Sequence, residues 1–272
     1  MVQLKKIAVA GLGSVGFRVA AALDRGEIPG LKLVAVSARS LQSSDQRLNT
    51  FSKDVIAADL RLLGQLAEIV VECLPPSEFM KVAESVLRKE GSTLVVASVG
   101  ALLENSHVIE LSSSCGSSLV APSGAVAGLD ALRAAKWAGL KRVQLITSKP
   151  PSSFGTKLCV GTAVIETSSI YEKIQIFSGS AREAVKAFPK NINVAATVSL
   201  AGVGPDKTEV EIWVDPALKF NTHELKIWSK AGEVSASSTN LPDEVNPKSS
   251  AVTAYSVLAC LQKITNPFAI GS

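Results

Sequence analysis

Apolar and polar positions in the first half of the chain repeat one unit: a short apolar run that ends in small residues, then a helical segment. The apolar runs cover residues 6–10, 31–37, 69–74 and 93–99. Continuous apolar runs of this length are typical of strands buried on both faces of a parallel sheet. Segments between them, such as 17–23, have helix-forming composition. We therefore predict alternating strands and helices around a parallel sheet.

From about residue 141 the pattern changes to short strand-like segments separated by turns. These segments are 141–148, 158–166, 173–178, 206–214, 223–230 and 233–238, with helices near 181–188 and 194–202. The pattern predicts a C-terminal α+β domain with a mixed or antiparallel sheet. A last helical stretch, 250–264, is expected to pack back onto the first domain. We place the domains at 1–121 with about 248–272, and at 122–247.

A glycine motif follows the first predicted strand directly: Gly11-Leu12-Gly13-Ser14-Val15-Gly16. Between a strand and a helix, this G-x-G-x-x-G pattern is typical of a dinucleotide-binding Rossmann domain. Gly11 permits the tight turn, Gly13 lets the backbone approach a pyrophosphate, and Gly16 lets the helix pack closely on the sheet. The helix N-terminus supplies N–H groups for that phosphate. The alternative, a tight turn that binds nothing, stays open at this point.

Cofactor selectivity depends on the end of the second predicted strand. An NAD-preferring site places Asp or Glu about 20 residues beyond the last glycine. This chain instead has Ser37, followed by Ala38 and Arg39. A hydroxyl and a planar cation suit a 2′-phosphate, whereas a carboxylate repels it. We therefore expect NAD or NADP as cofactor, leaning to NADP or dual use, with a solvated Arg39 as the alternative.

Composition excludes several other classes of protein. The net charge of +4 over 272 residues is scattered, and no basic run interleaves with aromatic residues, so we expect no nucleic acid partner. No apolar run approaches the roughly 20 residues of a membrane span. The first strand starts too early to leave room for a signal peptide, and we expect a cytoplasmic protein. The four cysteines lie far apart without metal-ligand spacing, which supports neither a metal site nor a disulfide framework.

Three side chains are candidates for proton transfer or anion binding. The chain has two histidines, and histidine is the side chain that titrates near neutral pH. His107 falls in a surface-like helical segment and is expected to be structural or solvent-exposed. His223 falls in a predicted loop between two strand-like segments, where reacting side chains are often placed, and the alternative is a structural histidine with satisfied hydrogen bonds. Lys149 precedes Pro150-Pro151 at the crossing between the domains, where it could bind a carboxylate, transfer a proton or simply be solvated.

Together and in this order, the motifs resemble those of the L-aspartate dehydrogenase family. The resemblance spans nearly the whole chain. Its most specific parts are F-P-K-N-I-N-V-A at 188–195 and N-P-K-S at 246–249. The other matching segments are the glycine motif, 71–73, 122–125 with 128–130, 149–151, and 215–216 with Asn221 and His223.

The resemblance implies a Rossmann domain joined to an α/β domain that carries substrate and forms a homodimer. Carried over by position, His223 is the catalytic acid/base, and Ala125 and Asn193 contact the nicotinamide end of the cofactor. Ser14 and Val15 contact the pyrophosphate, and the strand ends contribute Leu74, Pro75, Ala97 and Ser98. The chain departs from the family pattern at Ser37, where NAD-using members tend to have Asp, and at Val99-Gly100.

The implied reaction is the reversible oxidative deamination of L-aspartate through iminosuccinate to oxaloacetate and ammonia. One imidazole with a pKa near the working pH can serve both the amine deprotonation and the attack of water. The substrate carboxylates need cationic or hydroxyl partners, and Lys149, Lys248 and Ser249 are the candidates. The family also allows iminosuccinate to pass into NAD biosynthesis. Two alternatives stay open: another amino-acid or semialdehyde dehydrogenase, such as a homoserine-dehydrogenase-like enzyme using Lys149, and a non-enzymatic NAD(P)-sensing protein.

Overall fold

The computed structural model of the chain describes residues 4–39, 47–160, 163–188, 193–246, 249–266, 268 and 270–271. The chain divides into two compact units, Met1–Pro122 with Thr253–Ala269, and Ser123–Val252 with Ile270–Ser272. No helix within the described ranges combines the length and the apolar composition needed to cross a membrane.

The first unit is built on a parallel sheet with strand order β3-β2-β1-β4-β5-β6. Its strands are β1 (Lys5–Ala10), β2 (Leu31–Ser37), β3 (Ile56–Ala57), β4 (Ile69–Glu72), β5 (Thr93–Val96) and β6 (Ser118–Val120). Its helices are α1 (Ser14–Asp24), α2 (Leu63–Leu66), α3 (Phe79–Leu87), α4 (Gly100–Glu104), α5 (His107–Ser114) and α9 (Val252–Thr265). The order reverses between β1 and β4, which is the point where open α/β sheets bind ligands. The predicted Rossmann architecture is confirmed.

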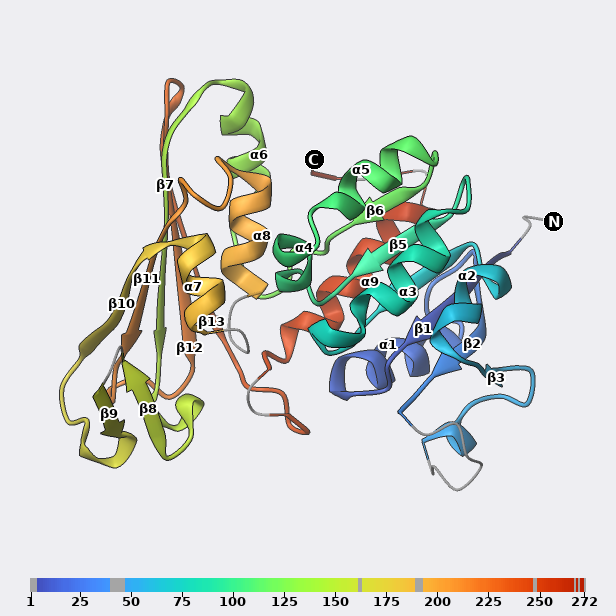
Figure 1. The fold of residues 1–272 in the computed structure, drawn as a ribbon, viewed down its shortest axis with the longest axis horizontal. Helices are drawn as coiled ribbons and strands as arrows, with labels where there is room; N and C mark the ends of the chain where they lie inside the picture. Colours follow the sequence, from blue (N-terminus) through green and yellow to red (C-terminus); the bar gives the residue numbers. More distant parts are fainter. Residues whose placement is uncertain are drawn as a thin grey trace. The chain divides into compact units, whose positions relative to one another are not determined.

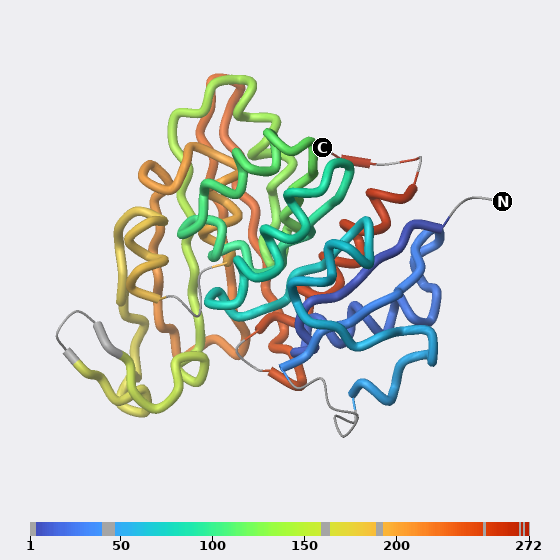
Figure 2. Tube along the Cα trace, turned by 45° about the vertical axis from the view of Figure 1, so that its right-hand side comes forward, coloured from blue at the N-terminus to red at the C-terminus, as the bar shows by residue number. Residues whose placement is uncertain are grey.

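The C-terminal helix α9 completes the core of this N-terminal unit. Figures 1 and 2 show it, in red, alongside the blue N-terminal elements. Its buried residues Ala254, Val257 and Leu261 join a cluster with Val19 of α1 and Val9 of β1. The prediction that the last helix packs onto the first domain is therefore confirmed, and the chain ends of this unit are held together by apolar contacts.

The second unit is built on a mixed sheet with strand order β10-β11-β7-β12-β13, as predicted. Its strands are β7 (Leu140–Lys149), β10 (Ile174–Ser180), β11 (Glu209–Val214), β12 (Asn221–Ser229) and β13 (Gly232–Asn240). The helices α6 (Leu129–Trp137), α7 (Ala181–Ala187) and α8 (Asn193–Ala201) lie on one side of this sheet (Figure 1). Strands β7 and β11 pair in parallel, and the other neighbours are antiparallel.

Two expectations for this unit are wrong in detail. The segment 158–166 is not one strand but two, β8 (Lys157–Val160) and β9 (Ala163–Glu166), which pair antiparallel as a separate sheet. His223 is not in a loop: β12 begins at Asn221, so His223 is the third residue of a strand. The strict burial alternation along β12 explains this placement, because the strand buries every second side chain against the helices.

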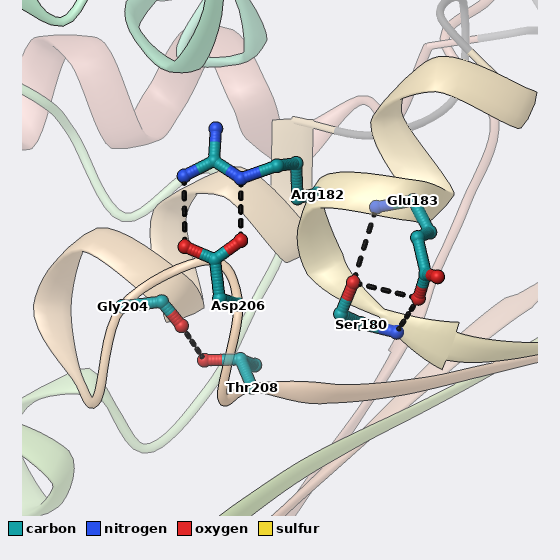
Figure 3. Close-up of polar contacts among 6 residues, drawn as sticks. All are labelled: Ser180, Arg182, Glu183, Gly204, Asp206 and Thr208. Carbon is teal, nitrogen blue, oxygen red and sulfur yellow. Dashed lines mark hydrogen bonds and ion pairs between the residues drawn. The ribbon is translucent and has the colours of Figure 1, made fainter.

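Local polar contacts fix the start of α7 (Figure 3). Ser180 and Glu183 form a capping box, in which each side chain bonds the other residue's backbone N–H. Arg182 forms a bidentate ion pair with Asp206, which lies before β11, and this guanidinium lowers the pKa of Asp206. These contacts hold α7 and the neighbouring α8–β11 loop in place at the edge of the sheet.

Candidate active site

The predicted cofactor residues of the first unit follow the carboxyl ends of four adjacent parallel strands. Gly11, Gly13, Ser14, Val15 and Gly16 follow β1, and Ser37 and Arg39 close β2. Leu74 and Pro75 follow β4, and Ala97 and Ser98 follow β5. Because these strands are parallel neighbours, the structure brings all of these residues to one edge of the sheet.

The glycine turn has the geometry that a pyrophosphate requires. Gly11 has φ +93°, and a Cβ there would lie 2.6 Å from the carbonyl oxygen of Cys73. A Cβ on Gly16 would clash with the Gly11 carbonyl oxygen. A Cβ on Gly13, in contrast, would meet no atom within 4 Å, and Gly13 is exposed at the N-cap of α1. Gly11 and Gly16 are therefore required by the fold, whereas Gly13 leaves space for a ligand.

A buried carboxylate joins the ends of β4 and β5, and the sequence reasoning gave it no role. Glu72 is fully buried and accepts hydrogen bonds from the backbone N–H of Leu74 at 2.6 Å and from the Ser98 hydroxyl at 2.7 Å. Burial raises the pKa of Glu72 to about 7, against the lowering effect of these hydrogen bonds. Glu72 thus positions two of the loops expected to line the cofactor site. The sequence signal for Glu72 is a charged residue at the end of an otherwise apolar strand.

Arg47, which the sequence did not single out, contacts the glycine turn. The Arg47 guanidinium donates a hydrogen bond of 2.8 Å to the carbonyl oxygen of Leu12. The next residue back, Gly11, donates its N–H to the carbonyl oxygen of Ser37 at 2.8 Å. Ser37 is buried, and Arg39 is exposed two residues further on. The sequence gave no signal for Arg47, because its contact with the turn depends on the path of the chain after β2.

In the second unit, polar residues form two neighbouring rows across the helix-covered face of the sheet. In the first row Thr147 of β7 pairs with His223 of β12, and His223 pairs with Ser238 of β13. Residues two apart on a strand share a face, so Lys149, Asn221 and Asn240 form the second row. The next row on the same face is apolar and contains Leu145 and Leu225.

His223 lies in the centre of these rows. It is 5% exposed, and its Nδ1 lies 2.9 Å from the Thr147 hydroxyl. Burial, and then the positive charge of Lys149, lower the pKa of His223 to about 3. The expectation of an imidazole pKa near the working pH is therefore wrong for this structure. The imidazole is neutral at neutral pH and available as a base.

Lys149 ends β7 as a buried lysine. It is 5% exposed, and burial lowers its pKa to about 8. It lines a small pocket with Thr147 and six apolar residues: Phe154, Phe188, Val194, Ala195, Val210 and Ile212. A buried cation beside a pocket is suited to binding an anionic group, and the solvated alternative for Lys149 is wrong.

Of the other predicted residues of this unit, Ala125 contacts the polar rows and Asn193 lies next to the pocket. The carbonyl oxygen of Ala125 accepts hydrogen bonds from Ser238 at 2.8 Å and Asn240 at 2.9 Å. Asn193 begins α8, directly before the pocket residues Val194 and Ala195. Ser249 lies in the segment before α9, where its hydroxyl accepts a hydrogen bond from Asn246. Lys248 lies outside the described residues. His107, at the start of α5 in the first unit, is exposed.

Two family models match the chain. Residues 11–118 match the NAD-binding domain of homoserine dehydrogenase, and residues 130–264 match the C-terminal domain of aspartate dehydrogenase. The second match contains His223, Lys149 and the polar rows described above, and the first contains the glycine turn.

Similar proteins cover nearly the full chain. The L-aspartate dehydrogenase of Bradyrhizobium diazoefficiens is 39% identical over 98% of this chain and 94% of its own length. L-aspartate dehydrogenase 3 of Bordetella bronchiseptica is 38% identical over 98% and 97%. Among solved structures, aspartate dehydrogenase from Thermotoga maritima has a TM-score of 0.75 at 27% identity, covering 98% of this chain and 99% of that chain. A hyperthermophilic archaeal homoserine dehydrogenase in complex with NADPH, at TM-score 0.60 and 13% identity over 99% and 100%, shares the fold.

Proposed function

Since the chain belongs to the L-aspartate dehydrogenase family, we propose that it oxidises L-aspartate with a nicotinamide cofactor and that His223 is the acid/base. The products are iminosuccinate and then oxaloacetate and ammonia, and the reverse reaction is a reductive amination. The observation that carries the proposal is the placement of buried His223 and Lys149 on one sheet face, next to a pocket.

The residues of the first unit fit the cofactor. The open space at Gly13 and the first N–H groups of α1, at Ser14 and Val15, suit a pyrophosphate. No acidic residue occupies the first turn of α1 to oppose that charge. When bound, the nicotinamide ring supplies the two-electron acceptor for the reaction. In the second unit, Ala125 and Asn193 are the residues assigned to its nicotinamide end.

Lys149 is the proposed partner of a substrate carboxylate. Its ammonium ion is buried at the edge of an otherwise apolar pocket, where a charge-assisted hydrogen bond is strong. Asn221 lies on the same face, in the row of Lys149, and can contribute an amide donor. Lys248 and Ser249 are the further candidates for the second carboxylate. L-aspartate is a dicarboxylate, and the buried cation at the edge of the pocket suits one of its two carboxylates.

His223 carries out the proton transfers. Oxidation of the Cα–N bond requires a neutral amine, so the imidazole first takes a proton from the substrate ammonium group. Once that proton has passed to solvent, the neutral imidazole takes a proton from the water that attacks the imine carbon and returns it to the nitrogen that leaves as ammonia. Two substrate carboxylates add negative charge near the imidazole, which raises its pKa from about 3 toward the working pH. This rise makes the imidazolium stable enough to form during turnover.

We also propose that the cofactor is NADP, or both NADP and NAD. Ser37 stands where a carboxylate would select NAD, and Arg39 follows it. Arg47 brings a guanidinium to the place where the glycine turn meets the end of β2. It binds the carbonyl oxygen of Leu12, and the neighbouring Gly11 donates a hydrogen bond to Ser37. A guanidinium at this turn favours a 2′-phosphate over a hydroxyl, and Arg39 is the proposed second one.

A cytoplasmic homodimer is the proposed state of the protein. The sheet face opposite the helices of the second unit carries half-buried Trp213 and Trp228, with Lys173 and Arg142 stacked on their rings. Aromatic and arginine side chains are enriched at protein interfaces. Cys73, Cys115 and Cys260 are unpaired, as in proteins of a reducing compartment. Supply of iminosuccinate to NAD biosynthesis is a further expectation from the family.

One observation favours a second candidate chemistry. A lysine with a pKa of about 8 can itself transfer protons, as in a homoserine-dehydrogenase-like enzyme. Comparison of H223N with K149M separates the two: the proposal predicts loss of proton transfer in H223N and loss of substrate affinity in K149M. A cofactor-sensing protein without catalysis would bind NADP but form no NADPH with any amino acid.

The direct test is the formation of NAD(P)H from L-aspartate, measured as absorbance at about 340 nm with each cofactor. Reduction that requires aspartate, with a higher kcat/KM for NADP than for NAD, supports the proposal. No reduction in this direction, and no oxidation of NAD(P)H with oxaloacetate and ammonia, would refute it.

A further inference from the structure

The partner of His223 on β7 is a hydroxyl group and not a carboxylate. Thr147 and His223 are directly opposite in the antiparallel pair β7–β12, with Oγ1 and Nδ1 2.9 Å apart. Both side chains are buried, at 6% and 5% exposure. The other hydroxyl next to the ring, Ser238 on β13, donates its proton to the carbonyl oxygen of Ala125. Thr147 is therefore the group that holds the ring.

A hydroxyl has a consequence for the imidazole that a carboxylate would not have. A carboxylate accepts hydrogen bonds only and stabilises the imidazolium ion, which raises the imidazole pKa. A hydroxyl is uncharged, and it can accept a hydrogen bond from Nδ1–H without fixing the imidazole as a cation. Lys149, on the same face, adds a positive charge that further disfavours the imidazolium ion. The site thus holds a neutral base in a defined orientation.

Threonine is suited to this task on a strand. Its branched Cβ restricts χ1, and its methyl group packs on the pleated surface, so the hydroxyl has few directions to take. The pocket beside Thr147 is lined by apolar side chains such as Val210 and Ile212. In such surroundings His223 is the polar partner that the described contacts give this hydroxyl. Since Nδ1 faces Thr147, an imidazole that takes a proton at Nε2 must carry its own proton on Nδ1 and donate it to the hydroxyl oxygen.

We propose that Thr147 is a positioning residue that selects the tautomer of His223: Nδ1–H donates to the Thr147 hydroxyl, which leaves Nε2 as the nitrogen that takes and returns the proton. This inference rests on the proposed acid/base role of His223. The tautomer itself is a property of the protein alone and can be measured without turnover.

The experiment is ¹⁵N NMR of the imidazole side chains at neutral pH. The chain has two histidines, so H107Q assigns the spectrum. We expect the Nδ1–H tautomer for His223 in the wild type and in T147S. In T147V, which keeps the shape and removes the hydroxyl, the Nε2–H tautomer should become populated. T222V is the matched control, since Thr222 lies on the opposite face of β12 and should leave the signals unchanged.

Kinetics provide the second readout. T147V should lower kcat with aspartate by about 10- to 100-fold, the size of effect known for the hydrogen-bond partners of metal-binding histidines, with the cofactor KM unchanged. T147S should retain most of the activity. An Nε2–H tautomer in the wild type, or the same tautomer and kcat in T147V, would overturn the inference about Thr147. Normal turnover by H223N would instead overturn the proposed function, together with the catalytic part of this inference.

Discussion

Replacement of Lys149 by methionine should stabilise the protein while it weakens substrate binding. The side chain is almost fully buried, and its pKa is about 8 instead of 10.5. A shift of this size corresponds to about 3 kcal/mol, since one pKa unit is worth about 1.4 kcal/mol. The folded protein therefore carries an unfavourable buried charge at pH 7. Methionine has similar length and no charge, and it removes that free-energy penalty.

The pH dependence of this stability difference follows from the protons that Lys149 binds in the folded and unfolded states. Between pH 8 and 10.5 the unfolded chain still binds the Lys149 proton and the folded protein does not. Wild-type stability therefore rises with pH across this window, and the full penalty applies below it. The stability advantage of K149M should be up to about 3 kcal/mol at pH 7 and should fall below about 1 kcal/mol at pH 10.

Urea unfolding of wild type and K149M at about pH 7 and about pH 10 measures the stability advantage of K149M at each pH. K141M is the matched control, because Lys141 lies exposed near the start of the same strand and should change the unfolding free energy by no more than about 0.5 kcal/mol. In turnover assays K149M should raise the KM for aspartate far more than that for the cofactor. Equal or lower stability of K149M at pH 7, or an equal gain at pH 10, would refute the reasoning.

Three further predictions concern the first unit. R39A should lower kcat/KM for NADP by about 10- to 100-fold and leave that for NAD nearly unchanged, as judged by initial rates; equal losses would contradict the 2′-phosphate role. G13A should weaken cofactor binding in a fluorescence titration with little change in Tm, whereas G11A should lower Tm because of its positive φ and the nearby Cys73 carbonyl oxygen. Burial raises the pKa of Glu72 from 4.5 to about 7, so the folded state binds the Glu72 proton more tightly than the unfolded chain does. The stability that this proton contributes is complete below pH 4.5 and is lost as the pH rises to about 7. E72Q should therefore gain up to about 3 kcal/mol relative to wild type between pH 4.5 and 7 in urea titrations, and a constant difference would contradict it.

The sequence was sufficient to predict the elements whose signal is local. The apolar runs at 31–37 and 69–74 are strands, and the glycine motif lies between β1 and α1, because strand burial and turn geometry depend on neighbouring residues. The return of the last helix was also predictable from its apolar face. The hairpin within 158–166 was missed, because two short strands and one long strand share the same alternation.

The site itself depends on contacts that the sequence does not display. His223 was identified, but its strand position and its low pKa follow from burial and from Lys149, 74 residues earlier in the chain. Thr147 was missed because its importance arises from cross-strand register with His223. Glu72 falls in the segment 71–73 that matches the family, but its role becomes visible only from its hydrogen bond with Ser98, which follows the next strand, β5.

The central claim is that His223 transfers the protons during aspartate oxidation. The most direct test compares aspartate-dependent NAD(P)H formation by wild type and H223N, with cofactor binding measured in both. We expect H223N to bind the cofactor like wild type and to lose about 10²- to 10⁴-fold in kcat. Turnover of aspartate by H223N at a rate near that of the wild type would contradict it.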